Sequence, residues 1–284
     1  SFIAYLVQKI DAQARLEDRI SSINGVYVFK PAGIKSKGYF LNRQNGLRAQ
    51  LFQFRDIAKK IVPFTSTLGD ITAANAYDYI KAMVLNLPHD IRMSTGMKMY
   101  LPQEILNWYR EGYKQANGTL NDYAGNIVNS PEGYGNIEFV VLTDLEGSKL
   151  IFITDENNIE ILEDVPNEKS IYRMEYLKRI TYIHADYKQT AAFVFAGFTL
   201  PKDSNFLGQA QYIWMNDAPC FSENFYVPMY GSLMSGAVEV NFNRIKTDIN
   251  LLSDVVTLAS GLAVGQIVKI VGNTAQLTNS KIKK

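Results

Sequence analysis

The feature that most constrains the fold is a change of periodicity along the chain. Helical spacing of apolar residues dominates the first 110 residues, whereas residues 137–199 contain the short apolar runs and alternating segments typical of strands. The chain has 284 residues, of which 47% are hydrophobic, so it can bury one large core or two modest ones. The pattern predicts an α+β fold.

Four segments have helical spacing: residues 2–20, 47–62, 71–87 and 103–110. The first is amphipathic, and its apolar face consists of Ile3, Leu6, Val7, Ile10, Ala14 and Leu16. Pro63 ends the second segment. Asp70 is the expected cap of the third, which we predict to be a long central helix. The fourth follows the short strand 97–101 and begins after Pro102.

A hairpin is predicted between the first two helices. Residues 26–29 and 39–41 have strand character, and they flank a basic, glycine-punctuated loop at residues 31–38. Lys35 and Lys37 lie at the tip of this loop, so we expect the loop to project from the body of the protein.

The β-rich part of the chain begins after a turn-rich excursion at residues 114–136. Strands are predicted at residues 137–142, 150–154 and 160–162, followed by two long strands at 171–184 and 190–199 that are joined by a turn at 186–189. The last long strand is almost entirely apolar, which favours a central place in a sheet. A further small β unit is predicted at 255–273.

Few residues of this chain are suited to catalysis. It has two histidines, His89 and His184, and one cysteine, Cys220, and it contains no phosphate-binding glycine loop, nucleophile elbow or metal-ligand spacing. His184 lies near Asp186, but no nucleophile accompanies the pair; His89 follows a helix end, and Cys220 is expected to be buried and inert. We therefore predict a protein that acts through contacts with other molecules rather than through catalysis. We expect it to have no enzymatic activity, cofactor or metal.

Three further motifs favour structural roles. The acidic run 155–164 lacks the glycine and ligand alternation of a calcium loop. Gly261, Gly265 and Gly272 do not have dinucleotide-binding spacing. The aromatic residues between 212 and 230 favour a core or an interface, with a glycan-stacking surface as the alternative; they are Tyr212, Trp214, Phe221, Phe225, Tyr226 and Tyr230.

Net charge, hydropathy and cysteine content argue against several classes of protein. The net charge of +1 disfavours nucleic acid or an acidic membrane as the primary partner. No apolar run approaches the roughly 18 residues of a membrane span. The single cysteine excludes an internal disulfide framework. The chain starts at Ser1, which a processed amino terminus and a fragment would both explain, and no signal peptide is expected there.

The order of these elements resembles that of the major capsid proteins of tailed bacteriophages, which have the Hong Kong 97-type fold. The resemblance rests on a helical arm, a basic projecting loop and a central helix. These are followed by a strand and helix at 98–106 and by a strand and asparagine turn at 150–158. It covers about residues 1–200.

The resemblance implies a division of the chain. Residues 1–46 would form the N-arm and the extended E-loop, and residues 47–89 and 166–200 the peripheral domain with its long spine helix. Residues 90–165 would form the axial domain, and residues 201–284 a carboxy-terminal extension. The assembly residues implied on the E-loop are Lys35, Lys37 and Tyr39, and the two lysines are the only sensible donors for the covalent cross-links of some relatives.

The function implied is that of a structural subunit, assembled in a bacterial cytoplasm into an icosahedral phage or prophage shell that encloses DNA. Its partners would be copies of itself in pentamers and hexamers, DNA bound without sequence specificity, and scaffolding, portal and protease proteins. No membrane is implied. The alternatives are an encapsulin-like nanocompartment shell, a glycan-binding module that uses the aromatic residues at 212–230, and an enzyme whose site the sequence does not reveal.

Overall fold

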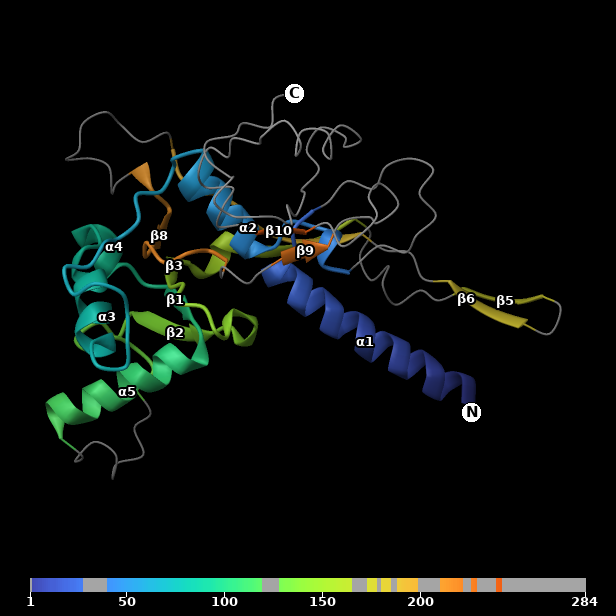
Figure 1. Ribbon diagram of the computed structural model, residues 1–284, viewed down its shortest axis with the longest axis horizontal. Helices are drawn as coiled ribbons and strands as arrows, with labels where there is room; N and C mark the ends of the chain where they lie inside the picture. Colours follow the sequence, from blue (N-terminus) through green and yellow to red (C-terminus); the bar gives the residue numbers. More distant parts are fainter. Residues whose placement is uncertain are drawn as a thin grey trace, which may run out of the picture.

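The structure is a computed structural model in which helices and strands combine in an α+β fold, as the sequence predicts (Figure 1). The residues it describes are 2–27, 40–118, 128–164, 173–177, 180–184, 188–198, 210–221, 226–228 and 239–241.

A four-stranded mixed sheet lies at the centre of the protein. Its strands are β1 (Met97–Leu101), β2 (Ile137–Val141), β3 (Phe152–Asp155) and β8 (Ile213–Met215), in the order β2-β1-β3-β8. β1 pairs with β2 in parallel and with β3 in antiparallel orientation, so that Met99 lies between Phe139 and Ile153. β3 pairs with β8 in antiparallel orientation.

The two faces of this sheet bury two separate clusters of apolar side chains. Met99 and Ile153 face the helices α3 (Ala76–Leu85) and α5 (Gln103–Asn117). Tyr100 and Phe152, whose rings stack with centroids 4.8 Å apart, face the opposite cluster. That cluster includes residues of α2 (Leu47–Phe52) and the carboxy-terminal end of α1 (Phe2–Asn24). Because successive side chains of a strand point to opposite faces of the sheet, the same strands contribute to both cores.

The prediction of a long helix over residues 71–87 is wrong both in the length of the helix and in its capping residue. α3 has ten residues, whereas α1 has 23 and α5 has 15. The Asn75 side chain accepts hydrogen bonds from the amide and hydroxyl of Thr72 and donates to the carbonyls of Leu68 and Asp70. These bonds stabilise a turn before the helix, because a short amide side chain competes for backbone groups.

The second predicted helix also ends early. α2 continues into a π-helical turn, η2 (Gln53–Ile57), and Lys59 then adopts a positive φ of 53°, so the helical conformation does not reach residue 62. In η2 the guanidinium of Arg55 is buried, donates to the carbonyls of Asn216 and Ala218 and pairs with Asp56 at 2.9 Å. α5, by contrast, runs through Asn117, into the excursion predicted from residue 114.

The prediction of two long strands at 171–184 and 190–199 is wrong, because the strands in these regions are short. The first region forms two strands, β5 (Arg173–Leu177) and β6 (Ile180–His184), which pair with each other in antiparallel orientation. β7 (Gln189–Phe193) pairs with β4 (Ile159–Glu163), and among the described strands it has no pairing with β6, contrary to the hairpin predicted there. β7 ends because the Asn158 side chain bonds both the amide and the carbonyl of Phe195 in place of a ladder partner.

The remaining elements are short. They are η1 (Phe40–Asn42), α4 (His89–Met93), η4 (Thr143–Leu145), η5 (Glu156–Asn158) and the paired strands β9 (Tyr226–Pro228) and β10 (Glu239–Asn241). η1 replaces the strand expected at 39–41. The β unit expected at 255–273 lies outside the described residues.

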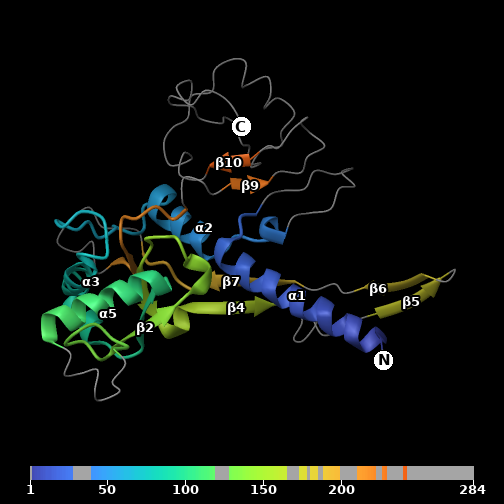
Figure 2. The same ribbon diagram turned by 60° about the horizontal axis from the view of Figure 1, so that its bottom comes forward.

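Two elements project from the body of the protein. α1 and the β5–β6 pair extend away from the central sheet toward the same end of the molecule in both views (Figures 1 and 2). Elements assigned to both predicted domains pack on the central sheet, and the division of the chain into peripheral and axial domains stays a prediction.

Candidate assembly surface

The projecting part of α1 has no core of its own. No residue from Ala4 to Ile20 is buried, and the polar side chains in this part pair along the helix. Asp11 pairs with Arg15 at 2.8 Å, and Gln13 donates to Glu17 at 3.1 Å. Such pairs contribute only about 0.2–0.5 kcal/mol each, and a helix without tertiary packing is marginal in water. This part of α1 therefore needs a packing partner.

An apolar stripe runs along this part of the helix. We call it the arm stripe, and it consists of Leu6, Val7, Ile10 and Ala14. Their three- and four-residue spacing places them on one face. Leu6 is 38% exposed and Ile10 39% exposed, so large aliphatic side chains face solvent in the isolated subunit. The stripe has the form of a helix face that packs in a groove or against another helix.

The carboxy-terminal end of α1 is fixed to the body by buried contacts. Gly25 donates to the carbonyl of Ser21, and Gly46 donates to the carbonyl of Gly25, both at 2.8 Å. Arg48, which is buried, donates from Nη1 to the Asn24 side chain at 2.7 Å and from Nε to the Cys220 carbonyl at 2.6 Å. Burial lowers the pKa of Arg48 to about 10. These contacts form what we call the inner joint of the arm.

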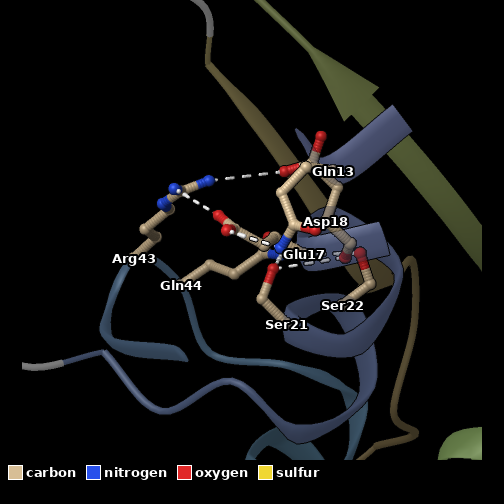
Figure 3. Close-up of polar contacts among 7 residues, drawn as sticks. All are labelled: Gln13, Glu17, Asp18, Ser21, Ser22, Arg43 and Gln44. Carbon is tan, nitrogen blue, oxygen red and sulfur yellow. Dashed lines mark hydrogen bonds and ion pairs between the residues drawn. The ribbon is translucent and has the colours of Figure 1, made fainter. Parts of the chain in front are cut away.

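A second, more exposed set of polar contacts links α1 to Arg43 and Gln44 (Figure 3). Arg43 reaches two acidic residues of α1, with Nη2 2.9 Å from Glu17 and Nη1 3.6 Å from Asp18. On another side, Nε of Arg19 lies 3.0 Å from the carboxylate of Asp144 in η4. We call these ion pairs the outer joint.

Gln44 links the arm to the body beside this outer joint. In the amide orientation that satisfies both of its ends, its oxygen accepts from the Ser21 hydroxyl at 3.0 Å and the Ser22 amide at 3.2 Å. Its nitrogen then donates to the carbonyl of Gln189 and the hydroxyl of Thr190 in β7. The arm is therefore tied to β7 as well as to the segment that follows the predicted loop.

The ends of the predicted projecting loop meet at the same joint. Val26 donates to the carbonyl of Leu41 at 2.7 Å, and Tyr27 donates to the Asn45 side chain at 2.9 Å. The two described ends of this segment, residues 27 and 40, thus lie beside α1. Lys35, Lys37 and Tyr39 lie outside the described residues, so their role in assembly stays a prediction.

The β5–β6 ribbon offers a second exposed surface. Its register pairs Arg173 with His184 and Glu175 with Tyr182 on one face, and it places Tyr176 on the other, where none of the described positions of the two strands has a charged residue. Tyr176 is 74% exposed. Within the described residues the ribbon has no third strand, and isolated two-stranded ribbons are at best marginally stable in water. A partner on the uncharged face would stabilise it.

The structure does not bring the histidines and the cysteine together into a site. His89 is the first residue of α4, shortly after the end of α3. His184 lies 3.9 Å from Glu175 across the ribbon. Cys220 is buried, as expected.

The acidic turn has a structural role. Asp155 accepts a hydrogen bond from the amide of Asn157, and Asn158 is buried and donates to Thr154. Among the residues that the structure describes, no group of acidic, histidine or cysteine side chains could hold a metal ion. No helix in the same part of the chain is long and apolar enough to cross a membrane.

The aromatic residues expected around 212–230 separate into two environments. Trp214 and Phe221 are buried in the two cores, in agreement with the structural interpretation, whereas Tyr212 is partly exposed and contacts Phe195. Phe225 and Tyr230, together with the three glycines 261, 265 and 272, lie outside the described residues.

The sequence did not indicate the joint. Gly25 lies 21 positions before Gly46 and 23 before Arg48, and the three residues belong to no motif, so local periodicity did not predict that they meet.

The chain was compared with known protein families, curated proteins and solved structures. No protein-family model matches the chain, and no curated protein matches it. The structure is similar to a chain in a solved structure described as "Satellite phage P4 procapsid including size determination (Sid) protein", with a TM-score of 0.44 and 12% sequence identity. The match covers 75% of this chain and 63% of that chain.

Proposed function

We propose that the chain is a structural subunit of a phage-type capsid with the Hong Kong 97-type fold, and that it self-assembles into a closed shell around DNA. The observation that carries this proposal is the arm: a helix of 23 residues that projects from the body with its apolar stripe exposed. An element of this kind gains stability only when another molecule covers it.

The proposal extends to the way copies associate. Each arm packs on a neighbouring subunit, and the loop at 25–46, with Lys35, Lys37 and Tyr39, reaches a neighbour in the same way. Residues 90–165 surround the axes of pentamers and hexamers, and scaffolding, portal and protease proteins act during assembly in the host cytoplasm. Many weak contacts then give a stable shell through multivalency.

The experiment compares assembly of the unmodified chain with that of an arm-stripe variant. The purified protein is followed by light scattering and electron microscopy over a range of concentrations. The double substitution Leu6→Gln and Ile10→Gln should raise the concentration needed for assembly by at least about tenfold, since each aliphatic side chain buried at a contact contributes about 1.5–3 kcal/mol. Circular dichroism should show an unchanged fold.

The matched control is Ala12→Gln, which places a glutamine on an exposed position of the same helix away from the arm stripe. This variant should assemble like the unmodified protein. Equal assembly of the stripe variant would exclude the stripe as a contact. A chain that remains monomeric under all conditions would overturn the proposed function. Particles that contain protein cargo in place of DNA would identify a nanocompartment shell.

A further inference from the structure

Two buried arginines, one from α2 and one from η2, bind the short segment of the chain that follows β8. Arg55 donates to the carbonyl of Asn216 at 3.1 Å and to that of Ala218 at 2.7 Å. Arg48 donates to the carbonyl of Cys220 at 2.6 Å. The carbonyls of three alternate residues of one segment are therefore held by two guanidinium groups.

This segment, residues 216–221, is part of the core of the protein. Phe221 is fully buried, and the guanidinium of Arg48 lies 5.0 Å from the centre of its ring. Asn216 is also fully buried, and its side chain accepts a hydrogen bond from the amide of Ile151 at 3.0 Å. The carbonyls that the two arginines bind are therefore held in place by the central sheet at one end of the segment and by a buried ring at the other.

Arg48 joins the same segment to the base of the arm. Its Nη1 donates to the Asn24 side chain at 2.7 Å, and Asn24 donates in turn to the carbonyl of Asp144 at 2.9 Å. Cys220, which accepts from Nε, lies 172 positions further along the chain than Arg48. Hydrogen bonds to a buried charged group are strong and are costly to lose, so displacement of one acceptor weakens the hold on the other.

We propose that Arg48 is a positioning residue that couples the attachment of the arm to the docking of segment 216–221. A docked segment keeps the guanidinium where it binds Asn24, and a displaced segment lets the base of the arm open more often. The coupling itself does not depend on the proposed function. Its consequence for assembly rests on that function: the arm, at the start of the chain, is firmly attached only in subunits whose body has folded as far as residue 221.

The test measures hydrogen exchange of single backbone amides in full-length, dispersed subunits. The amide of Gly46 donates to the carbonyl of Gly25 and reports on the attachment of the arm, whereas the amide of Met99 in β1 reports on the body. Arg48→Met removes both hydrogen bonds and keeps an apolar side chain. It should raise the exchange rate at Gly46 at least about tenfold, with a smaller change at Met99.

The coupling is tested by a change at the end of the segment that Arg55 holds. Arg55→Lys keeps a positive charge for Asp56, but an ammonium does not reproduce the planar group that serves this carboxylate and two carbonyls together. It should raise the exchange rate at Gly46 about threefold to tenfold, within the range for coupled residues of one network. In a chain that also has Arg48→Met, it should have no effect on this rate.

Two further variants separate the coupling from a general loss of structure. Arg110→Lys is the matched control, because Arg110 of α5 donates to the carbonyl of Val128 in a different part of the protein. It should leave the exchange rate at Gly46 unchanged. Arg48→Lys keeps the charge and should give a rate between those of the unmodified chain and Arg48→Met, and it replaces Arg48→Met if that variant does not fold.

Equal acceleration at Gly46 and Met99 would overturn the inference, since it would show a loss of stability throughout the protein. A response to Arg55→Lys that persists in the presence of Arg48→Met would also overturn it. Arg55→Lys should raise the concentration needed for assembly, and an unchanged concentration would contradict the consequence for assembly. Failure of the unmodified subunits to assemble would overturn the proposed function alone, because exchange in dispersed subunits still reports on Arg48.

Discussion

Gly25 and Gly46 allow two backbone segments to cross at the base of the arm. A β-carbon at Gly25 would overlap the carbonyl oxygen of Ser21 and lie 2.7 Å from that of Gln44. Both obstacles are backbone atoms, so no side-chain rotation relieves the contact. The closeness of this crossing is what allows the arm, the predicted loop and α2 to meet at one place.

Gly25→Ala should therefore destabilise the protein by about 1–3 kcal/mol, the usual range for an overpacked site. Urea denaturation followed by circular dichroism measures the change. Gly135→Ala is the control, since a β-carbon there meets no atom within 4 Å. A Gly25→Ala variant as stable as the control would show that the crossing can open without cost.

The two faces of the β5–β6 ribbon can be compared with a matched pair of substitutions. Tyr176 and Tyr182 are both exposed, and the register places them on opposite faces of the ribbon. At the positions of β5 and β6 that the structure describes, the face of Tyr176 has no charged residue, whereas Tyr182 lies beside Glu175 and His184. If the uncharged face contacts a neighbouring subunit, a charge on that face opposes assembly because it would have to be desolvated.

Tyr176→Asp should reduce the yield of particles at least about tenfold, whereas Tyr182→Asp, with the same change in charge and strand propensity, should reduce it much less. Light scattering gives the yield, and circular dichroism checks that each subunit is folded. Equal loss in the two variants would indicate that the ribbon contributes through its stability and not through one face.

Some of these elements could be predicted from local patterns and others could not. The strand at 97–101 has the predicted bounds because Gly96 and Pro102 delimit an apolar run. The start of α3 was missed because it depends on the hydrogen bonds of one side chain, Asn75. The ribbon was missed because Leu177 and Ile180 pair around two residues that carry no turn signal. The joint depends on contacts between distant segments, which periodicity does not encode.

At the scale of the whole molecule, two buried tyrosine side chains make the free energy of unfolding decrease at alkaline pH. Burial is the main cause that raises the pKa of Tyr79 and of Tyr109 to about 12. In the unfolded chain a tyrosine titrates near pH 10. Between these values the unfolded chain loses protons that the folded protein retains, so the free energy of unfolding falls as pH rises. The contribution is fully present below about pH 10.

The urea midpoint should therefore decrease from about pH 10 to pH 12, with up to about 2–3 kcal/mol lost per tyrosine, from 1.4 kcal/mol for each unit of pKa difference. Tyr109→Phe should reduce this slope, whereas Tyr5→Phe, at an exposed position of α1, should retain it. A slope that is the same in both variants would mean that Tyr109 does not keep its proton when the protein is folded.

The central sheet has apolar side chains packed on both of its faces, and this has a consequence for how the chain folds. The two apolar clusters share the same sheet, because β1, β3 and β8 contribute side chains to each of them. Loss of one layer exposes the reverse of the same strands to water, so the two halves should melt in a single cooperative transition. A subunit with this property does not offer a half-folded body during assembly: only its projecting parts remain to be ordered by a neighbour.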